Sequence, residues 1–101
     1  MCGSTVGGLS TEGIDVSKET VIQGTVTRDG QPVAGAYVRL LDAGGEFTAE
    51  VQASATGGFR FFAAPGRWTL RALAAGGAIG QTELTAETGV NDADVEVTPA
   101  S

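Results

Sequence analysis

The only cysteine of the chain is Cys2, and the chain contains no histidine. A methionine that precedes a small residue such as cysteine is commonly removed, and its loss would place this thiol beside a free α-amino group. The positive charge of that group favours the thiolate, which is the form that accepts and passes on sulfur. Cys2 is therefore the candidate sulfur-accepting thiol of this sequence.

Two other interpretations of Cys2 stay open. In the first, it is an exposed terminal cysteine with no task. In the second, it is the lipid-modified first residue of a mature lipoprotein, which would make the protein an anchored extracellular module. The N-terminus lacks the charged and apolar regions of a signal peptide, and this argues against the lipoprotein if the sequence is native.

The residues needed for common catalytic sites are missing. Without histidine there is no Ser-His-Asp or Cys-His arrangement, and no imidazole to bind zinc or iron. Asn91, Asp92 and Asp94 carry oxygen atoms suited to calcium, but they lack the spacing of a dedicated loop and read as a solvated turn. We therefore expect no enzyme activity, no catalytic residue, no metal and no cofactor.

Length and charge restrict the class of protein further. The 101 residues fit one small domain, and the net charge of −6 opposes nucleic-acid binding through phosphate contacts. No apolar run approaches the roughly 20 residues that cross a bilayer, so we expect no membrane partner. A single cysteine cannot form an internal disulfide, which suits a reducing compartment, and we expect a cytoplasmic protein.

Glycines separate short segments that are rich in Val, Thr, Phe, Leu and Ala, which is typical of an all-β domain. The expected strands lie at residues 20–27, 36–42, 46–54, 58–63, 67–75, 79–84 and 93–98. Seven strands of this size predict a β-sandwich over residues 20–99. Residues 1–19 are too poor in apolar side chains to offset the entropy of ordering them, so we expect a flexible N-terminal arm.

Alternation along these strands predicts the core, because successive side chains point to opposite faces. The inward residues are Ile22, Val26, Val38, Leu40, Phe59, Phe61, Trp68, Leu70, Val95 and Val97. Asp29-Gly30 predicts a tight turn after the first strand. The indole N–H of Trp68 needs an acceptor if the ring is buried.

The opposite, outward positions carry the candidate partner surface. It consists of Tyr37, Arg39, Arg60, Phe62 and Arg71, with Leu41 and Leu73 pointing outward beside them. Arginine mixed with aromatic residues is typical of protein interfaces. The alternative is cross-strand pairing of these arginines with carboxylates such as Glu50 and Glu96, which stabilises little when exposed.

Glycine, proline and apolar positions in the first half of the chain follow a known pattern. They are Gly24, Val26, Gly30, Pro32-Val33, Gly35-Ala36, Val38 and Leu40, followed by "TGGFRF" and "APGRWTL". This pattern resembles that of carboxypeptidase-regulatory-like and prealbumin-like domains over residues 20–98, with Trp68 where such domains usually carry tyrosine. The resemblance implies a seven-stranded Greek-key sandwich of transthyretin type. Hydroxyisourate hydrolases share that fold but use histidines and a C-terminal Tyr-Arg-Gly-Ser, whereas this chain ends "VTPAS", so that activity is not expected.

A closer resemblance covers nearly the whole chain. The stretches "KETVIQGTV", "GAYVRLLDAGGEFTAEV" and "ASATGGFRFFAAPGRWTLRAL", with the opening "MCG", resemble an actinobacterial family of small proteins labelled sulfur-metabolism protein SseC. Members of that family are usually encoded beside thiosulfate sulfurtransferases. The resemblance implies an association with sulfur transfer, and it carries over only Cys2 as a candidate functional residue.

These observations lead to two functional hypotheses and a third, weaker one. The first is a non-enzymatic accessory or sulfur-carrier protein that docks a rhodanese-like thiosulfate sulfurtransferase, with Cys2 accepting a persulfide. The alternative is a protein-binding scaffold in which Cys2 has no role. The third is the lipid-anchored extracellular module. We expect a monomer or a homodimer, because exposed edge strands favour pairing.

Overall fold

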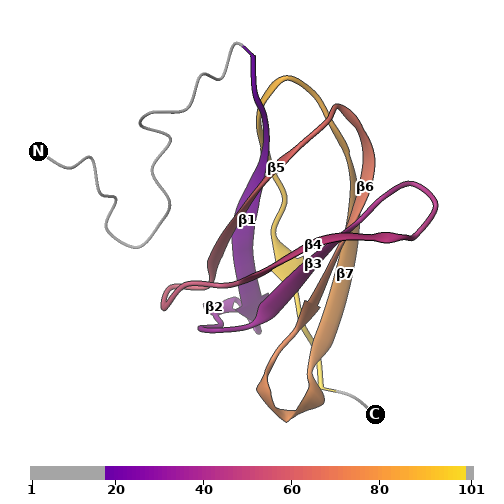
Figure 1. The fold of residues 1–101 in the computed structure, drawn as a ribbon. Coiled ribbons are helices and arrows are strands. Elements are labelled where there is room, and N and C mark those ends of the chain that lie inside the picture. Colours follow the sequence, from indigo (N-terminus) through magenta and orange to yellow (C-terminus); the bar gives the residue numbers. More distant parts are fainter. Residues whose placement is uncertain (1–17, 100–101) are drawn as a thin grey trace, which may run out of the picture.

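The computed structural model describes residues 18–99, which form two β-sheets packed face to face (Figure 1). Its elements are β1 (Thr20–Arg28), β2 (Gln31–Pro32), β3 (Tyr37–Leu41), β4 (Phe47–Gln52), β5 (Gly58–Ala63), β6 (Gly66–Leu73), the short 3-10 helix η1 (Ala75–Gly77), β7 (Ile79–Ala86), β8 (Gly89–Asp92) and β9 (Val95–Glu96). The prediction of an all-β sandwich is confirmed, although these residues form nine strands instead of seven. Within residues 18–99, no helix is long and apolar enough to span a membrane.

The first sheet is built around β1. β5 pairs antiparallel with residues 20–25 of β1, and β2 forms a hairpin with its C-terminal end. β8 and β9 run parallel to β1, opposite residues 20–23 and 26–27. Of the predicted arm, residues 1–19, only the last two residues are described, and Cys2 lies outside the described residues.

The second sheet has the strand order β4-β3-β6-β7, and all its pairs are antiparallel. The two sheets bury the apolar side chains of their inner faces against each other. Nine of the ten predicted core residues are at most 4% exposed, and the exception, Trp68, is partly buried and packs against the others. Its indole Nε1 donates to the carbonyl oxygen of Ala64 at 2.8 Å, so this oxygen is the acceptor that the indole N–H needs.

The turn after β1 forms where the sequence predicted it. Asp29 and Gly30 connect β1 to β2 with φ angles of 52° and 79°. Two consecutive positive φ angles define the primed hairpin turn, whose twist matches that of the flanking strands. Glycine adopts this conformation without a steric penalty, and aspartate is among the few other residues that tolerate it.

The end of the chain differs from the prediction. The expected strand 93–98 is reduced to β9, and the segment that was expected to be a turn forms β8. Between the two strands, Ala93 donates to the carbonyl oxygen of Gln23 at 2.8 Å, and the side chain of Asp94 accepts from the backbone N–H of Thr25 at 2.9 Å. The aspartate thus replaces a backbone partner of β1, and it splits one parallel strand into two short ones.

Glu96 on β9 holds the hairpin turn in place. Its carboxylate accepts hydrogen bonds from the hydroxyl of Thr27 at 2.5 Å and from the backbone N–H of Asp29 at 2.7 Å. These bonds favour the ionised form and lower the pKa of Glu96 below its ordinary value of 4.5, with Thr27 as the larger cause and Asp29 as the next. Because this pKa is lower in the folded state than in the unfolded state, the ionised carboxylate of Glu96 stabilises the fold above pH 4.5. This stabilisation is lost as the pH falls through the lowered pKa.

We expect Glu96→Gln to lower the urea midpoint at neutral pH, and the difference from wild type to disappear in acid. The measurement is urea unfolding followed at a series of pH values. Glu87→Gln is the matched control, because its carboxylate makes no hydrogen bond within residues 18–99. A Glu96→Gln protein whose stability changes with pH as steeply as that of wild type would contradict the assignment.

Candidate functional site

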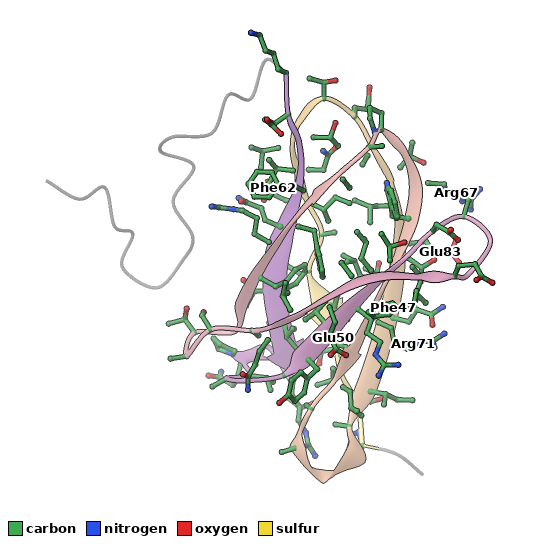
Figure 2. All side chains as sticks on the ribbon, viewed as in Figure 1. Phe47, Glu50, Phe62, Arg67, Arg71 and Glu83 are labelled. Carbon is green, nitrogen blue, oxygen red and sulfur yellow. The ribbon has the colours of Figure 1, made fainter. Side chains whose placement is uncertain are left out.

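The five residues predicted as one partner surface lie on two opposite faces. Tyr37 and Arg39 on β3 and Arg71 on β6 lie on the outer face of the second sheet. Arg60 and Phe62 on β5 belong to the first sheet, and Figure 2 shows Phe62 beside β1 and β5, apart from Arg71. The structure therefore divides the predicted surface, because the outer faces of two packed sheets point away from each other.

Two rows of side chains cross the outer face of the second sheet, as the strand register requires. The first, called the apolar row here, places three apolar residues side by side and consists of Gln52, Tyr37, Leu73 and Ile79. The second, the polar row, is its neighbour along the strands and consists of Glu50, Arg39, Arg71 and Gln81. Directly opposite side chains in such rows are close enough to interact.

A groove of about 320 Å³ lies between these rows. Its lining consists of Tyr37, Arg39, Glu50, Arg71, Ala72, Leu73 and Ile79. The apolar row is open to solvent, since Tyr37 and Leu73 are each 48% exposed and Ile79 is 53% exposed. The groove therefore combines exposed apolar surface with two guanidinium groups.

Sequence reasoning did not include Ile79 or Gln81 in this site. Both lie on β7, where Gly80, Thr82 and Leu84 are less exposed than their neighbours. The alternation along β7 could have shown that Ile79 and Gln81 point to the same face of the strand. The position of β7 beside β6, which brings these residues to the groove, depends on strand pairing that a single sequence does not show.

Arg39 is paired within its own sheet. Its Nε donates to Oε2 of Glu50 at 2.8 Å, and its guanidinium carbon lies 6.0 Å from the ring centroid of Phe47. Figure 2 shows Glu50 and Phe47 on the same part of β4. The cross-strand pairing considered for the arginines is thus present at this position, and an exposed pair of this kind contributes about 0–1 kcal/mol to stability.

Arg71 has a different kind of partner. Its Nε and Nη2 both donate to Oε1 of Gln81, at 3.2 and 3.1 Å. The third arginine of this face, Arg67, pairs with Glu83 at 3.1 Å. Glu96, the other carboxylate expected to pair with arginine, binds the hairpin turn instead.

Leu41 departs from its prediction. It lies in register with Phe47 on one side and Thr69 on the other, at the β-bulge of β4. Although alternation places it on the outer face, it is only 6% exposed. Leu41 therefore does not contribute to the exposed surface of the second sheet.

The outer face of the first sheet carries Arg60 and Phe62. Nε of Arg60 donates to Oε1 of Gln23 at 3.2 Å, while its buried Nη2 has no hydrogen-bond partner among residues 18–99. Phe62 is 59% exposed. A second hollow of about 340 Å³ on this sheet is lined in part by Gln23, Asp92 and Asp94.

Two polar residues near that hollow, Asn91 and Asp94, bind the backbone. The amide nitrogen of Asn91 donates to the carbonyl oxygens of Val21, Glu87 and Gly89, at 2.8 to 3.2 Å. Asn91 and Asp92 belong to β8, so the prediction of a solvated turn is wrong for them. In the part of the chain that the structure describes, no three His, Cys, Asp or Glu residues lie close enough together to hold a metal ion.

Sequence comparison shows close relatives in mycobacteria. A model of the family described as "Protein of unknown function (DUF1416)" matches residues 2–97. The uncharacterized proteins Rv0814c and Rv3118 of Mycobacterium tuberculosis are each 54% identical over 100 residues, which covers 97% of this chain and all of theirs. An uncharacterized protein of Mycolicibacterium smegmatis is 57% identical over 84% of this chain and 96% of its own.

Solved structures share the fold at low sequence identity. A DUF3823 family protein of Parabacteroides merdae has a TM-score of 0.63 at 19% identity, over 82% of this chain and 47% of that one. The 5-hydroxyisourate hydrolase of Klebsiella pneumoniae has a TM-score of 0.58 at 20% identity, over 80% of this chain and 92% of its own. A dioxygenase domain from Streptomyces has a TM-score of 0.61 at 14% identity, over 94% and 88%. These likenesses establish a transthyretin-like fold and carry no activity over to this chain.

Proposed function

The chain belongs to the DUF1416 family, whose description gives no activity, and we propose that it is a non-enzymatic accessory protein of sulfur transfer that docks a protein partner. The proposed docking face is the groove with its apolar and polar rows. The proposed partner is a thiosulfate sulfurtransferase of the rhodanese-like kind, and Cys2 is the proposed acceptor of its sulfur. The cytoplasm suits this role, since a reducing compartment keeps the thiol free.

The observation that carries the docking part is the half-exposed apolar row beside two arginines. Tyr37, Leu73 and Ile79 leave apolar surface in water that a partner would bury. Tyrosine and arginine are enriched among the residues that dominate binding energy in protein interfaces. The guanidinium groups of Arg39 and Arg71 line the groove and do not belong to the core, so a partner at this face can reach them.

The sulfur part rests on the resemblance of the chain to the SseC sulfur-metabolism proteins. In the proposed step, the Cys2 thiolate attacks the outer sulfur of a cysteine persulfide on the transferase. An S–S bond forms on Cys2 while the S–S bond of the transferase breaks, and the transferase cysteine leaves as a thiolate. No further oxidant or reductant is needed, because the oxidation state of the transferred sulfur is the same on Cys2 as on the transferase.

One experiment tests both the docking and the sulfur transfer. The intact mass of the protein is measured after incubation with thiosulfate and an active sulfurtransferase. Wild type is expected to gain one sulfur atom that reductant removes, and Cys2→Ser is expected to gain none. The double variant Arg39→Glu/Arg71→Glu is expected to gain sulfur about tenfold more slowly, since like charges across an interface oppose docking. It should also fail to co-purify with the transferase.

The control Arg28→Glu/Arg67→Glu changes the net charge by the same amount but leaves the groove intact. Absence of sulfur on wild type, with the transferase demonstrably active, would contradict the carrier role. If wild type and Cys2→Ser then still co-purified with the transferase through the groove, the protein would be a binding scaffold in which Cys2 has no role. Unchanged sulfur transfer in the groove variant would refute the docking face.

A further inference from the structure

The polar row carries more positive than negative charge. It contains two guanidinium groups and one carboxylate, and Arg39 and Arg71 are directly opposite each other in the register of β3 and β6. Like charges in this arrangement repel each other and destabilise the pair of strands. The single carboxylate, Glu50, is bonded to Arg39. The row therefore has one uncompensated cation in a protein with a net charge of −6.

That cation is Arg71. Among residues 18–99, the ion pairs join Arg39 to Glu50 and Arg67 to Glu83, and none of them includes Arg71. Two of its donors share a single neutral amide oxygen of Gln81. A guanidinium presents its N–H groups as a fork that matches the two oxygens of a carboxylate, and such charged pairs are roughly twice as strong as neutral hydrogen bonds. The present partner of Arg71 thus satisfies its geometry only in part and its charge not at all.

The apolar row lies next to this unpaired charge. Leu73 follows Arg71 by two residues on β6, and successive residues on one face of a strand lie about 6.4–6.8 Å apart. The groove continues from Arg71 over Ala72 and Leu73 to Ile79. A complementary surface would therefore carry a carboxylate about 7 Å from an apolar side chain, as at positions i and i+2 of an extended segment.

We propose that Arg71 binds a carboxylate side chain of the docking partner, while a neighbouring apolar side chain of the same segment packs against Tyr37, Leu73 and Ile79. This inference rests on the docking part of the proposed function and is independent of Cys2. The incoming carboxylate displaces the amide oxygen of Gln81 from Arg71. It also neutralises the repulsion between the two opposed arginines.

The test uses the full chain labelled with ¹⁵N and two probe peptides, acetyl-Thr-Leu-Thr-Glu-Thr-amide and its counterpart with Gln in place of Glu. Titration by NMR is expected to shift the backbone resonances of residues 37–39, 71–73 and 79–81. The Glu peptide is expected to bind about fivefold more tightly than the Gln peptide, because only its carboxylate carries a charge opposite to that of the guanidinium and offers two equivalent oxygens to it.

Substitutions in the polar row sharpen this comparison. Arg71→Gln removes the cation, and Gln81→Glu supplies the missing carboxylate from within the sheet, so both are expected to abolish the preference for the Glu peptide. Gln81→Ala removes the neutral acceptor and is expected to retain the preference. Arg67→Gln, on the same strand but outside the groove, is the matched control.

Three results would overturn the inference. The first is equal affinity for the two peptides with shifts at the groove, which would leave the docking face standing and refute only its carboxylate specificity. The second is shifts confined to the other sheet, or none at millimolar peptide. The third is a concentration-dependent shift of the same resonances without peptide, which would assign the face to a second copy of this chain.

Discussion

Gly24→Ala is expected to destabilise the protein by about 3 kcal/mol. A Cβ at this position would lie 2.1 Å from the carbonyl oxygen of Ala93 and 2.6 Å from its carbon. Both atoms belong to the backbone between β8 and β9, so the clash can be relieved only by moving the chain. Gly80→Ala is expected to have an effect of the same size, because its Cβ would lie 2.0 Å from the carbonyl oxygen of Glu96.

The measurement is the free energy of unfolding in urea. Gly44→Ala is the control, because its Cβ would meet nothing nearer than a side-chain oxygen of Asp42 at 3.5 Å. We expect that variant to lie within about 0.5 kcal/mol of wild type. A Gly24→Ala protein as stable as the control would show that the segment between β8 and β9 does not pack against β1 as described.

Phe59→Ala is expected to lower the free energy of unfolding by about 3–5 kcal/mol. Phe59 is 2% exposed, and its ring centroid lies 6.2 Å from that of Phe61, so truncation leaves a cavity between the sheets. This loss is a large part of the roughly 5–15 kcal/mol that stabilises a typical domain. Urea unfolding followed by circular dichroism measures it.

Phe62→Ala makes the same chemical change on the same strand but on the solvent side. It is 59% exposed, and we expect a loss below about 1 kcal/mol. If Phe59→Ala does not fold, Phe59→Leu provides a measurable substitute with a smaller loss. Equal losses for the two alanine variants would contradict the assignment of inward and outward faces on β5.

Much of the sandwich could be predicted because the sequence alternates clearly. On β5, Phe59 and Phe61 are buried whereas Phe62 is exposed, as the period of two requires. The Asp29-Gly30 turn was readable for a similar reason, since these residue types favour the primed turn. Such signals are local, and they act within a few residues of the position that they determine.

The remaining features depend on residues far apart in the chain. The outward positions on β3 and β5 look alike in the sequence, yet strand pairing places Arg39 and Arg60 on opposite sides of the molecule. β8 was not predicted because its polar residues are typical of turns. Its partner strand is β1, far away in the sequence: the hydrogen bond from Asn91 to Val21 joins residues that are 70 positions apart. The groove was found only in part, because Ile79 joins it through the pairing of β7 with β6.

The parallel addition of β8 and β9 to β1 also has a consequence for how the chain folds. β1 precedes the other strands in the chain, whereas β8 and β9, which pair with it, follow all the others, and Thr27 bonds to Glu96 across 69 residues. The same C-terminal segment reaches the second sheet through the bridge between Ile79 and Thr98. Closing loops of this length is slow, so we expect folding in milliseconds to seconds, with the β3, β4, β6 and β7 sheet able to form before the first sheet is complete. Until residues 89–98 have been synthesised, one edge of β1 has no strand partner. Its unpaired N–H and C=O groups can then bind a strand of another chain, so we expect aggregation to be most favoured at this stage.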